Sequence, residues 1–365
     1  MQRLCLRLLT AALAVSMPVV AQRTVTVAGS GAALEQALAN ASVGDVFLVR
    51  PGVYTGQLRA DRGIAIVCDP GALVTVGLDV HDLPAGETLR WLGGEVSWLN
   101  IRDCRGSVFV ERAGLGAATV LNSAHVGFNA CSPPTFWGVG ASGLMRLTCR
   151  DSAVASVDCV WAGFDFATGV DATSSRLTVR GGSIMGGCGS LPLLASVPPI
   201  RTTDTTLVVG RGSTGAEAVI IGCGTSAILA SGGVVRLDPT ARLMSGSAPG
   251  VGGTAAVELR PVPSIVSQGV AATRTWDATI HAEIGSTTAT LMGPPAAPTG
   301  LTEGLWLDRF RAVVVDLGIV GPSGQRSIAA RAPRVVVGMA IVAQPVSLSA
   351  SGAVHLGVPT PLVFG

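Results

Sequence analysis

Between residues 60 and 258 the chain is a succession of short apolar stretches, each ended by Gly, Ser or Asp. One pattern recurs, as LNIR at 99–102, LTCR at 147–150 and LTVR at 177–180, with LVV at 207–209 as a shorter copy. These spacings fit coils of roughly 20 to 30 residues, with two coils in the first interval. One such coil cannot bury its apolar face alone, so successive coils must stack. The pattern predicts a solenoid of short strands, and an ordinary β-sandwich is the alternative.

The composition favours an all-β protein and excludes two classes of partner. Gly is 48 of 365 residues, and Val, Thr and Ser are abundant, as expected for strands with tight turns. Charged residues are only 13% of the chain and the net charge is +2, so no basic stripe is available for nucleic acid. Beyond residue 21 the longest apolar run, 335–343, is too short for the ~20 residues of a spanning helix. We therefore expect neither nucleic-acid binding nor a membrane span.

The first 21 residues have the organisation of an export signal. Arg3 and Arg7 precede an apolar segment at 8–20, and small or medium residues lead to a cleavage point after Ala21. A short buried helix is the alternative. The signal predicts a secreted or cell-surface protein whose mature chain begins at Gln22.

The segment that follows combines a short helix, a strand and a turn. In 32–54, AALEQALANASVGDVFLVRPGVY, Leu34 and Leu38 belong to an apolar stripe at helical spacing, which Gly44 ends. This order of parts resembles the N-terminal cap of secreted right-handed parallel β-helix proteins of the pectate-lyase-like superfamily. An amphipathic helix would cover the open first coil of such a solenoid. The resemblance implies a capping helix and a right-handed parallel β-helix over 22–258.

The composition and the polarity pattern of the sequence change near residue 258. Residues 260–263 (RPVP) have the composition of a linker, and 264–365 contain about seven short stretches of alternating polarity. This pattern predicts a β-sandwich over 261–365. With Trp276, LWLD at 305–308 and the strand at 343–348, it resembles a C-terminal module of secreted proteins of planctomycete-type bacteria.

Seven cysteines remain after the predicted cleavage, an odd number, so at least one is free or pairs between chains. There is no CxxC pair, and the four His residues do not cluster with cysteines, which argues against a zinc site. We expect most of these cysteines to be small apolar core residues.

Catalysis is one hypothesis, because the resemblance implies an acidic polysaccharide in a groove and a lyase mechanism that uses Ca²⁺ and an Arg or Lys base. Arg102–Asp103 and Arg150–Asp151 occupy matching places after an apolar strand, and Arg180 follows the same pattern. Arg150 and Arg180, with Asp151, are therefore the lyase candidates, and an Arg base would need a strongly lowered pKa. The alternative is that such Arg–Asp pairs satisfy each other at turns.

Glycan binding without catalysis is the other hypothesis. Trp161 lies close to Asp158 and Asp165, and an indole face with carboxylates suits a sugar chain. Trp137 lies in the loop 131–138, which is either a binding edge or a loop folded over the solenoid. The alternative for Trp161 is a place in the core.

Family motifs for catalysis are missing, which favours the non-catalytic hypothesis. The Asp-Asp pair and Gly-His-Gly loop of hydrolases on this fold do not occur, and VWAG at 160–163 departs from a lyase motif. His125 would be a ligand or base, or else a structural residue. We expect a secreted, non-catalytic protein that binds extracellular polysaccharide or other cell-surface components, or has a structural role. We expect no cofactor, and Ca²⁺ only if the protein is a lyase.

Overall fold

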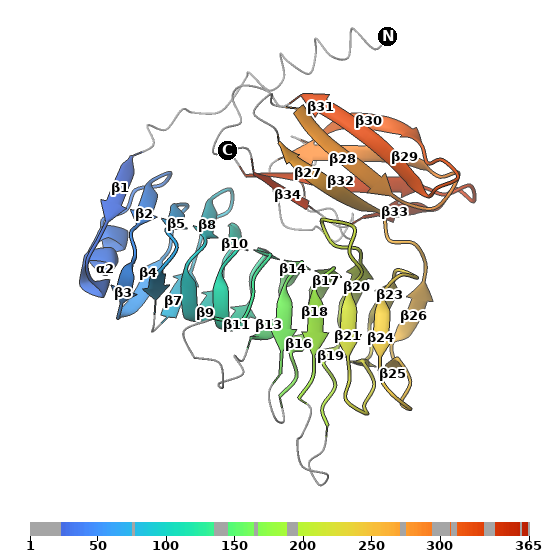
Figure 1. Ribbon diagram of the computed structural model, residues 1–365, viewed down its shortest axis with the longest axis horizontal. Helices are drawn as coiled ribbons and strands as arrows, with labels where there is room; N and C mark the ends of the chain where they lie inside the picture. Colours follow the sequence, from blue (N-terminus) through green and yellow to red (C-terminus); the bar gives the residue numbers. More distant parts are fainter. Residues whose placement is uncertain are drawn as a thin grey trace.

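The computed structural model describes residues 23–74, 77–134, 145–163, 167–187, 196–270, 275–293, 307, 312–331, 340–357 and 360–363. Residues 23–259 form coils whose strands pair in parallel with the coils before and after them, so the molecule contains a parallel β-helix (Figure 1). The predicted fold class is confirmed, and the antiparallel sheets come at the C-terminus. The predicted signal peptide lies outside the described residues.

Three parallel sheets run along the solenoid, here called sheets A, B and C. Sheet A comprises β1 (Thr24–Val27), β2 (Val46–Val49), β5 (Ala65–Cys68), β8 (Thr88–Leu92), β10 (Ser107–Glu111), β12 (His125–Asn129), β14 (Ala153–Val157), β17 (Arg176–Arg180), β20 (Thr206–Gly210), β23 (Val234–Leu237) and β26 (Ala256–Leu259). Sheet B comprises β3 (Gly52–Tyr54), β4 (Gln57–Ala60), β6 (Ala72–Val74), β7 (Gly77–His81), β9 (Glu95–Arg102), β11 (Gly114–Leu121), β13 (Arg146–Arg150), β16 (Val170–Thr173), β19 (Ile200–Thr203), β22 (Ile228–Ser231) and β25 (Val251–Gly253). Sheet C comprises β15 (Val160–Ala162), β18 (Ser183–Met185), β21 (Val219–Ile221) and β24 (Arg242–Met244).

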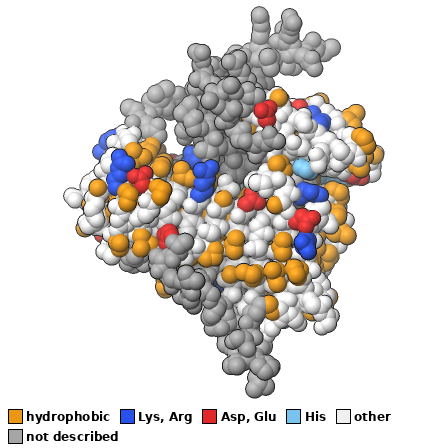
Figure 2. All heavy atoms as spheres, in the orientation of Figure 1, with side chains coloured by type: hydrophobic (Ala, Val, Ile, Leu, Met, Phe, Trp, Pro, Cys, Tyr) orange, Lys and Arg blue, Asp and Glu red, His pale blue; other side chains and the backbone are white. Residues whose placement is uncertain are grey.

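Sheet C has an apolar outer face. Met185, Ile221 and Met244 are consecutive partners in the parallel register and form one outward row. Hydrophobic side chains lie in a row across this face, over β18, β21 and β24, and charged side chains are few there (Figure 2). The low charge of the sequence is thus visible on the surface of the folded coils.

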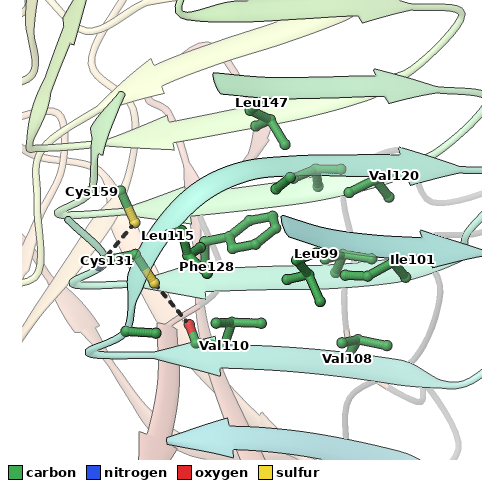
Figure 3. Packing of buried hydrophobic residues seen from close by; sticks show 14 of the residues in the cluster. Leu99, Ile101, Val108, Val110, Leu115, Val120, Phe128, Cys131, Leu147 and Cys159 are labelled. Atoms are coloured by element: carbon green, nitrogen blue, oxygen red, sulfur yellow. Dashed lines mark hydrogen bonds between the residues drawn. The ribbon is translucent and has the colours of Figure 1, made fainter. Parts of the chain in front are cut away.

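The solenoid core follows from the two-residue period of a strand, because alternate side chains point inward. Val108 and Val110 of β10 lie in the same interior as Phe128 of β12, and Cys131 and Cys159 stack on neighbouring coils (Figure 3). Five described cysteines are free and buried, as predicted for most of them: Cys68, Cys104, Cys131, Cys149 and Cys159. Cys223 is disulfide-bonded.

A helix closes the first end of the solenoid. The helix α2 (Gly31–Ala39) buries Leu34 and Leu38 against the first coils. The apolar stripe predicted from the sequence is therefore the face that covers the core. None of the described helices is both long and apolar enough to cross a membrane.

The C-terminal region forms two antiparallel sheets. One contains β27 (Ser264–Val270), β28 (Thr275–His281) and β31 (Gln325–Arg331), and the other contains β29 (Thr287–Gly293), β30 (Val313–Ile319), β32 (Ala340–Leu348), β33 (Val354–Leu356) and β34 (Thr360–Val363). Ile265, Trp276 and Ile280 are buried in its core. These sheets lie over sheet A, where Phe109 packs with Leu307 and Val342 (Figure 1). The middle strands of sheet A are therefore buried on both faces.

The sequence suggested that all copies of the recurring tetrapeptide occupy one equivalent position in the coils. In the structure they do not. Its copies at 99–102 and 147–150 lie on β9 and β13 of sheet B, with β11 between them, so the first interval does hold two coils. The copy at 177–180 lies on β17 of sheet A. The predicted equivalence of Arg180 with Arg150 is therefore wrong. Both sheets alternate inward apolar and outward polar residues, so local sequence alone does not distinguish them.

A ladder of buried hydroxyls joins successive coils at the turn from sheet B to sheet A. Ser123, Ser152, Ser175 and Thr205 each donate a hydrogen bond to the carbonyl oxygen two residues earlier. The hydroxyls of Ser152, Ser175 and Thr205 each also accept the backbone N–H of the ladder residue in the coil before. We call these four residues the hydroxyl ladder.

Changing Ser152 to Ala tests the ladder. The Ser123 N–H, which lies 3.0 Å from Ser152 Oγ, would lose its acceptor in a buried place. We expect the free energy of unfolding to fall by about 1–3 kcal/mol, measured by denaturant titration. The control is Ser183→Ala on β18, outside the ladder, with an expected change within about 0.5 kcal/mol. Equal losses in the two variants would contradict a special role for the ladder.

Candidate functional site

The lyase candidates predicted from the sequence do not converge. Arg150 ends β13 with an exposed side chain, and Asp151 follows it in the turn to sheet A. Asp158 lies at the other end of β14, and Arg180 ends the neighbouring strand β17. Asp151 and Asp158 are thus separated by the full length of a strand. The structure contradicts a catalytic set formed by Arg150, Arg180 and these aspartates.

Arg180 is a fully buried structural residue. Its Nε atom donates to the Arg211 carbonyl at 2.8 Å, and Nη2 donates to the Ile265 carbonyl of β27 at 2.8 Å. Burial lowers the pKa of Arg180 to about 10, and the nearby Asp158 carboxylate opposes that shift. The guanidinium links the solenoid to the first C-terminal strand. The side chain is fully enclosed by the protein, so its assignment as a base is wrong.

Asp158 and Trp161 are also structural. Asp158 accepts hydrogen bonds from the backbone N–H of Ser213, at 2.9 Å, and from the Ser213 hydroxyl. Trp161 is buried in the solenoid, where its indole N–H donates to Ser156 Oγ at 2.7 Å and its ring meets Phe128 edge-on. The prediction that Trp161 stacks on a sugar is wrong, because β15 directs its side chain inward. Trp137 and Asp165 lie outside the described residues.

The Arg–Asp pairs expected at turns occur in a different arrangement. Arg102 makes its ion pair with Asp79 of the preceding coil, at 2.9 Å, and Asp103 instead accepts a hydrogen bond from Asn122 Nδ2 at 2.8 Å. Both residues therefore interact with residues of adjacent coils and not with each other, because parallel stacking brings equivalent positions of successive coils close together.

A groove of about 860 Å³ runs along the turn from sheet B to sheet A. It is open to solvent beside the hydroxyl ladder and crosses five coils. With ~4.8 Å between strands, its length along the solenoid axis is ~19 Å. Its lining residues are Asp82, Leu83, Pro84, Ala85, Asp103, Cys104, Arg105, Asn122, Ser123, Ala124, Asp151, Ser152, Ala153, Ser174 and Arg176.

One wall of the groove is a row of polar residues in the left-handed backbone region. One residue per coil contributes, with φ between 44° and 55°. Asp and Asn tolerate this conformation better than most residues, which explains the residue types. The residue that follows each of them points inward. In three of the five coils this residue is a member of the hydroxyl ladder, and in the other two a residue of another type takes that place. The members of this polar row are Asp82, Asp103, Asn122, Asp151 and Ser174.

The other wall lies at the beginning of the sheet A strands and carries two arginines. Arg105 is exposed, and Arg176 is partly buried at the start of β17. Ala124 and Ala153 lie between them in the stack of coils, and their small side chains leave the space open. Arg105 and Arg176 are three coils apart, or ~14 Å. The groove therefore presents two cationic side chains along its length, and only small side chains lie between them.

Neither guanidinium forms an ion pair with a carboxylate of the described residues. Within the described part of the chain, no carboxylate lies within 4.0 Å of Arg105 or Arg176. The Nη1 atom of Arg176 is buried and has no hydrogen-bond partner among those residues. A buried donor without an acceptor is unfavourable. Arg176 is only partly buried, and an anion in the groove would accept from the part of the side chain that lines it.

His125 lies near the groove but does not line it. Its Nδ1 atom is 2.9 Å from Ser107 Oγ, and its ring meets Phe109 edge-on with centroids 5.2 Å apart. Burial lowers the pKa of His125 to about 3, so the imidazole is neutral at neutral pH. The structural interpretation of this residue is therefore supported.

Asp103 and Asp151 were singled out from the sequence, but both arginines of the groove were missed. A signal for the polar row was present, because a polar residue that tolerates positive φ precedes each ladder residue. The pairs are Asn122–Ser123, Asp151–Ser152, Ser174–Ser175 and Asp204–Thr205. Among the residues that the structure describes, no group of three or more His, Cys, Asp or Glu is placed to hold a metal ion.

The strand order and the stacked coils define the chain as a parallel β-helix protein with antiparallel C-terminal sheets. No protein-family model and no curated protein matches this sequence. Among solved structures, the chain is similar to an alginate lyase from Paenibacillus sp. str. FPU-7, with 12% identity over 65% of this chain and 97% of that chain, and a TM-score of 0.18. A TM-score of this size does not establish an equivalent arrangement of coils.

Proposed function

We propose that the protein is exported and binds an acidic extracellular polysaccharide in the groove, without cleaving it. The observation that supports this most directly is the pair of unneutralised guanidinium groups, Arg105 and Arg176, along one open groove. Guanidinium groups bind carboxylates and sulfates through strong, charge-assisted hydrogen bonds. Two such groups spaced along a groove suit a ligand with repeated negative charges.

The polar row supports an extended carbohydrate as the ligand. Carboxylate oxygens of Asp82, Asp103 and Asp151 accept hydrogen bonds, as sugar hydroxyls require. The same carboxylates would repel a ligand that is charged on every face. A chain with acidic groups on one side and hydroxyls on the other would meet arginines on one wall and acceptors on the other.

Binding without cleavage fits the positions of the candidate bases. Arg180 is enclosed in the protein, and His125 is enclosed by Ser107 and Phe109. Of the three lyase candidates Arg150, Arg180 and Asp151, only Asp151 lines the groove. The second candidate function remains a lyase on an acidic polysaccharide, with Asp151 and Arg176 among the charged groups that line the groove.

Changing Arg176 to Ala tests the binding site. Loss of one charge-assisted hydrogen bond is worth about 1.5–3 kcal/mol, so we expect the Kd for a bound acidic polysaccharide to rise ~10- to 100-fold. The measurement is calorimetry over a panel of uronate-containing and sulfated polysaccharides, at two salt concentrations. The control is Arg201→Ala, because Arg201 is an exposed arginine of sheet B that pairs with Asp171 outside the groove.

The same panel separates binding from cleavage. Elimination creates an unsaturated uronate whose ultraviolet absorbance rises with time, and reducing-end release reports hydrolysis. Binding with flat traces in both assays supports the proposal. A rising absorbance that is lost in Arg176→Ala would establish the lyase instead. Absence of binding to every member, or an equal effect of the two arginine variants, would overturn the assignment of the groove.

A further inference from the structure

The two ends of the solenoid differ in how the core is covered. At the first end α2 buries Leu34 and Leu38. In the last coil the inward positions of β26 are open, with Val257 52% and Leu259 71% exposed. Their register partners one coil earlier, Val235 and Leu237, are 1% and 6% exposed. The apolar interior therefore reaches solvent at the C-terminal end of the solenoid.

Among the described residues, the outer backbone edge is also unpaired at this end. Strands β24, β25 and β26 are the last members of sheets C, B and A. In β26 the N–H groups of Ala256 and Arg260 point to β23, where they bond to the carbonyls of Gly233 and Leu237. Because direction alternates along a strand, the N–H and C=O groups of Val257 and Leu259 face away from β23. The end thus combines free strand edges with an apolar centre, a combination that favours pairing with another chain.

We infer that the open end joins the open end of a second copy in a two-fold symmetric dimer. A second copy presents the same three strand edges around the same apolar cross-section. The first end offers no matching apolar surface, because α2 covers the apolar core there. If the open end binds only the open end of another copy, the assembly stops at a dimer and no filament forms.

Charge complementarity supports this occupant. An antiparallel pairing of β26 with its copy that sets Leu259 opposite Leu259 places Glu258 opposite Arg260 of the second copy, in both directions. Glu258 and Arg260 are about two-fifths and one-third exposed and already attract each other within one chain, at 3.0 Å. A pairing centred on Glu258 would instead oppose two carboxylates. The outward charges therefore favour the register in which the inward leucines meet.

The test is the mass of the purified protein in solution, measured by sedimentation equilibrium up to about 100 µM, with variants at two exposed leucines. We expect a dimer for the unaltered chain and at least a ~100-fold rise in its dissociation constant for Leu259→Lys. The matched control is Leu317→Lys, because Leu317 is 69% exposed on β30, in the C-terminal sheets. This control should leave the dimer unchanged.

A monomeric unaltered chain would overturn the inference, as would a dimer that survives Leu259→Lys or is lost in Leu317→Lys. Circular dichroism verifies that each variant is folded. If Leu259→Lys does not fold, hydrogen exchange of the unaltered chain decides. The amides of Val257 and Leu259 should become protected as concentration rises, and exchange that is independent of concentration would contradict the dimer.

Discussion

Acidification from pH 7 to pH 4 should lower the free energy of unfolding by about 3 kcal/mol through His125 alone. Burial lowers the pKa of His125 from 6.5 to about 3 in the folded protein. Between these values the unfolded chain binds a proton that the folded chain excludes. The contribution to stability is therefore complete above pH 6.5 and is lost progressively as the pH falls to about 3. Denaturant titrations across this range measure it.

The variant His125→Gln should remove this part of the pH dependence, while His81→Gln should retain it. His81 lies near the surface beside Asp82, at 3.0 Å. Burial, with nearby arginines, also lowers the pKa values of His281 and His355, so the unaltered protein should lose more stability than His125 accounts for. Equal pH slopes for the unaltered chain and His125→Gln would show that the imidazole is not enclosed.

Replacing Trp161 with Ala should lower the free energy of unfolding by about 3–5 kcal/mol and leave polysaccharide binding unchanged. The substitution removes a fully buried ring and leaves a cavity beside Phe128. It also leaves the Ser156 hydroxyl without its indole donor. Thermal or denaturant unfolding measures the loss, and calorimetry with the bound polysaccharide measures affinity.

The matched control is Trp98→Ala, because Trp98 is 59% exposed on β9. It should change stability by less than about 1 kcal/mol. A large loss of affinity with little loss of stability in Trp161→Ala would reverse the conclusion, because it would mean that Trp161 contacts the ligand.

The fold could be predicted because its signals are local. A helix with an apolar stripe before a strand, as in 32–54, specifies a cap within one short segment, and the repeated short strands specify stacking. The assignment of a strand to its sheet could not be predicted, because sheets A and B share one alternating pattern. For this reason Arg180 was grouped with Arg150, although they lie on different sheets.

The groove could not be predicted from local sequence, because its parts are distant along the chain. Asp82 and Arg176 line one groove although more than ninety residues separate them. Its depth depends on the small side chains of Ala124 and Ala153, which carry no chemical signal of their own. Asp151 was found because it follows an apolar strand, yet its predicted partners were wrong. A search for one polar residue per coil would have found the wall, and only the stacking shows which arginines oppose it.

Sheet A, with a core on each of its faces, also explains where the chain tolerates changes in length. A slip of one residue in β10 would turn Phe109 into the solenoid and expose Val108 and Val110 to the C-terminal sheets, so both interfaces would be lost together. Sheet A strands accordingly stay at four or five residues, while successive strand starts differ by 18 residues, from 107 to 125, or by 30, from 176 to 206. Insertions and deletions are thus confined to the connections, and each coil can vary in length without altering the register on which both cores depend.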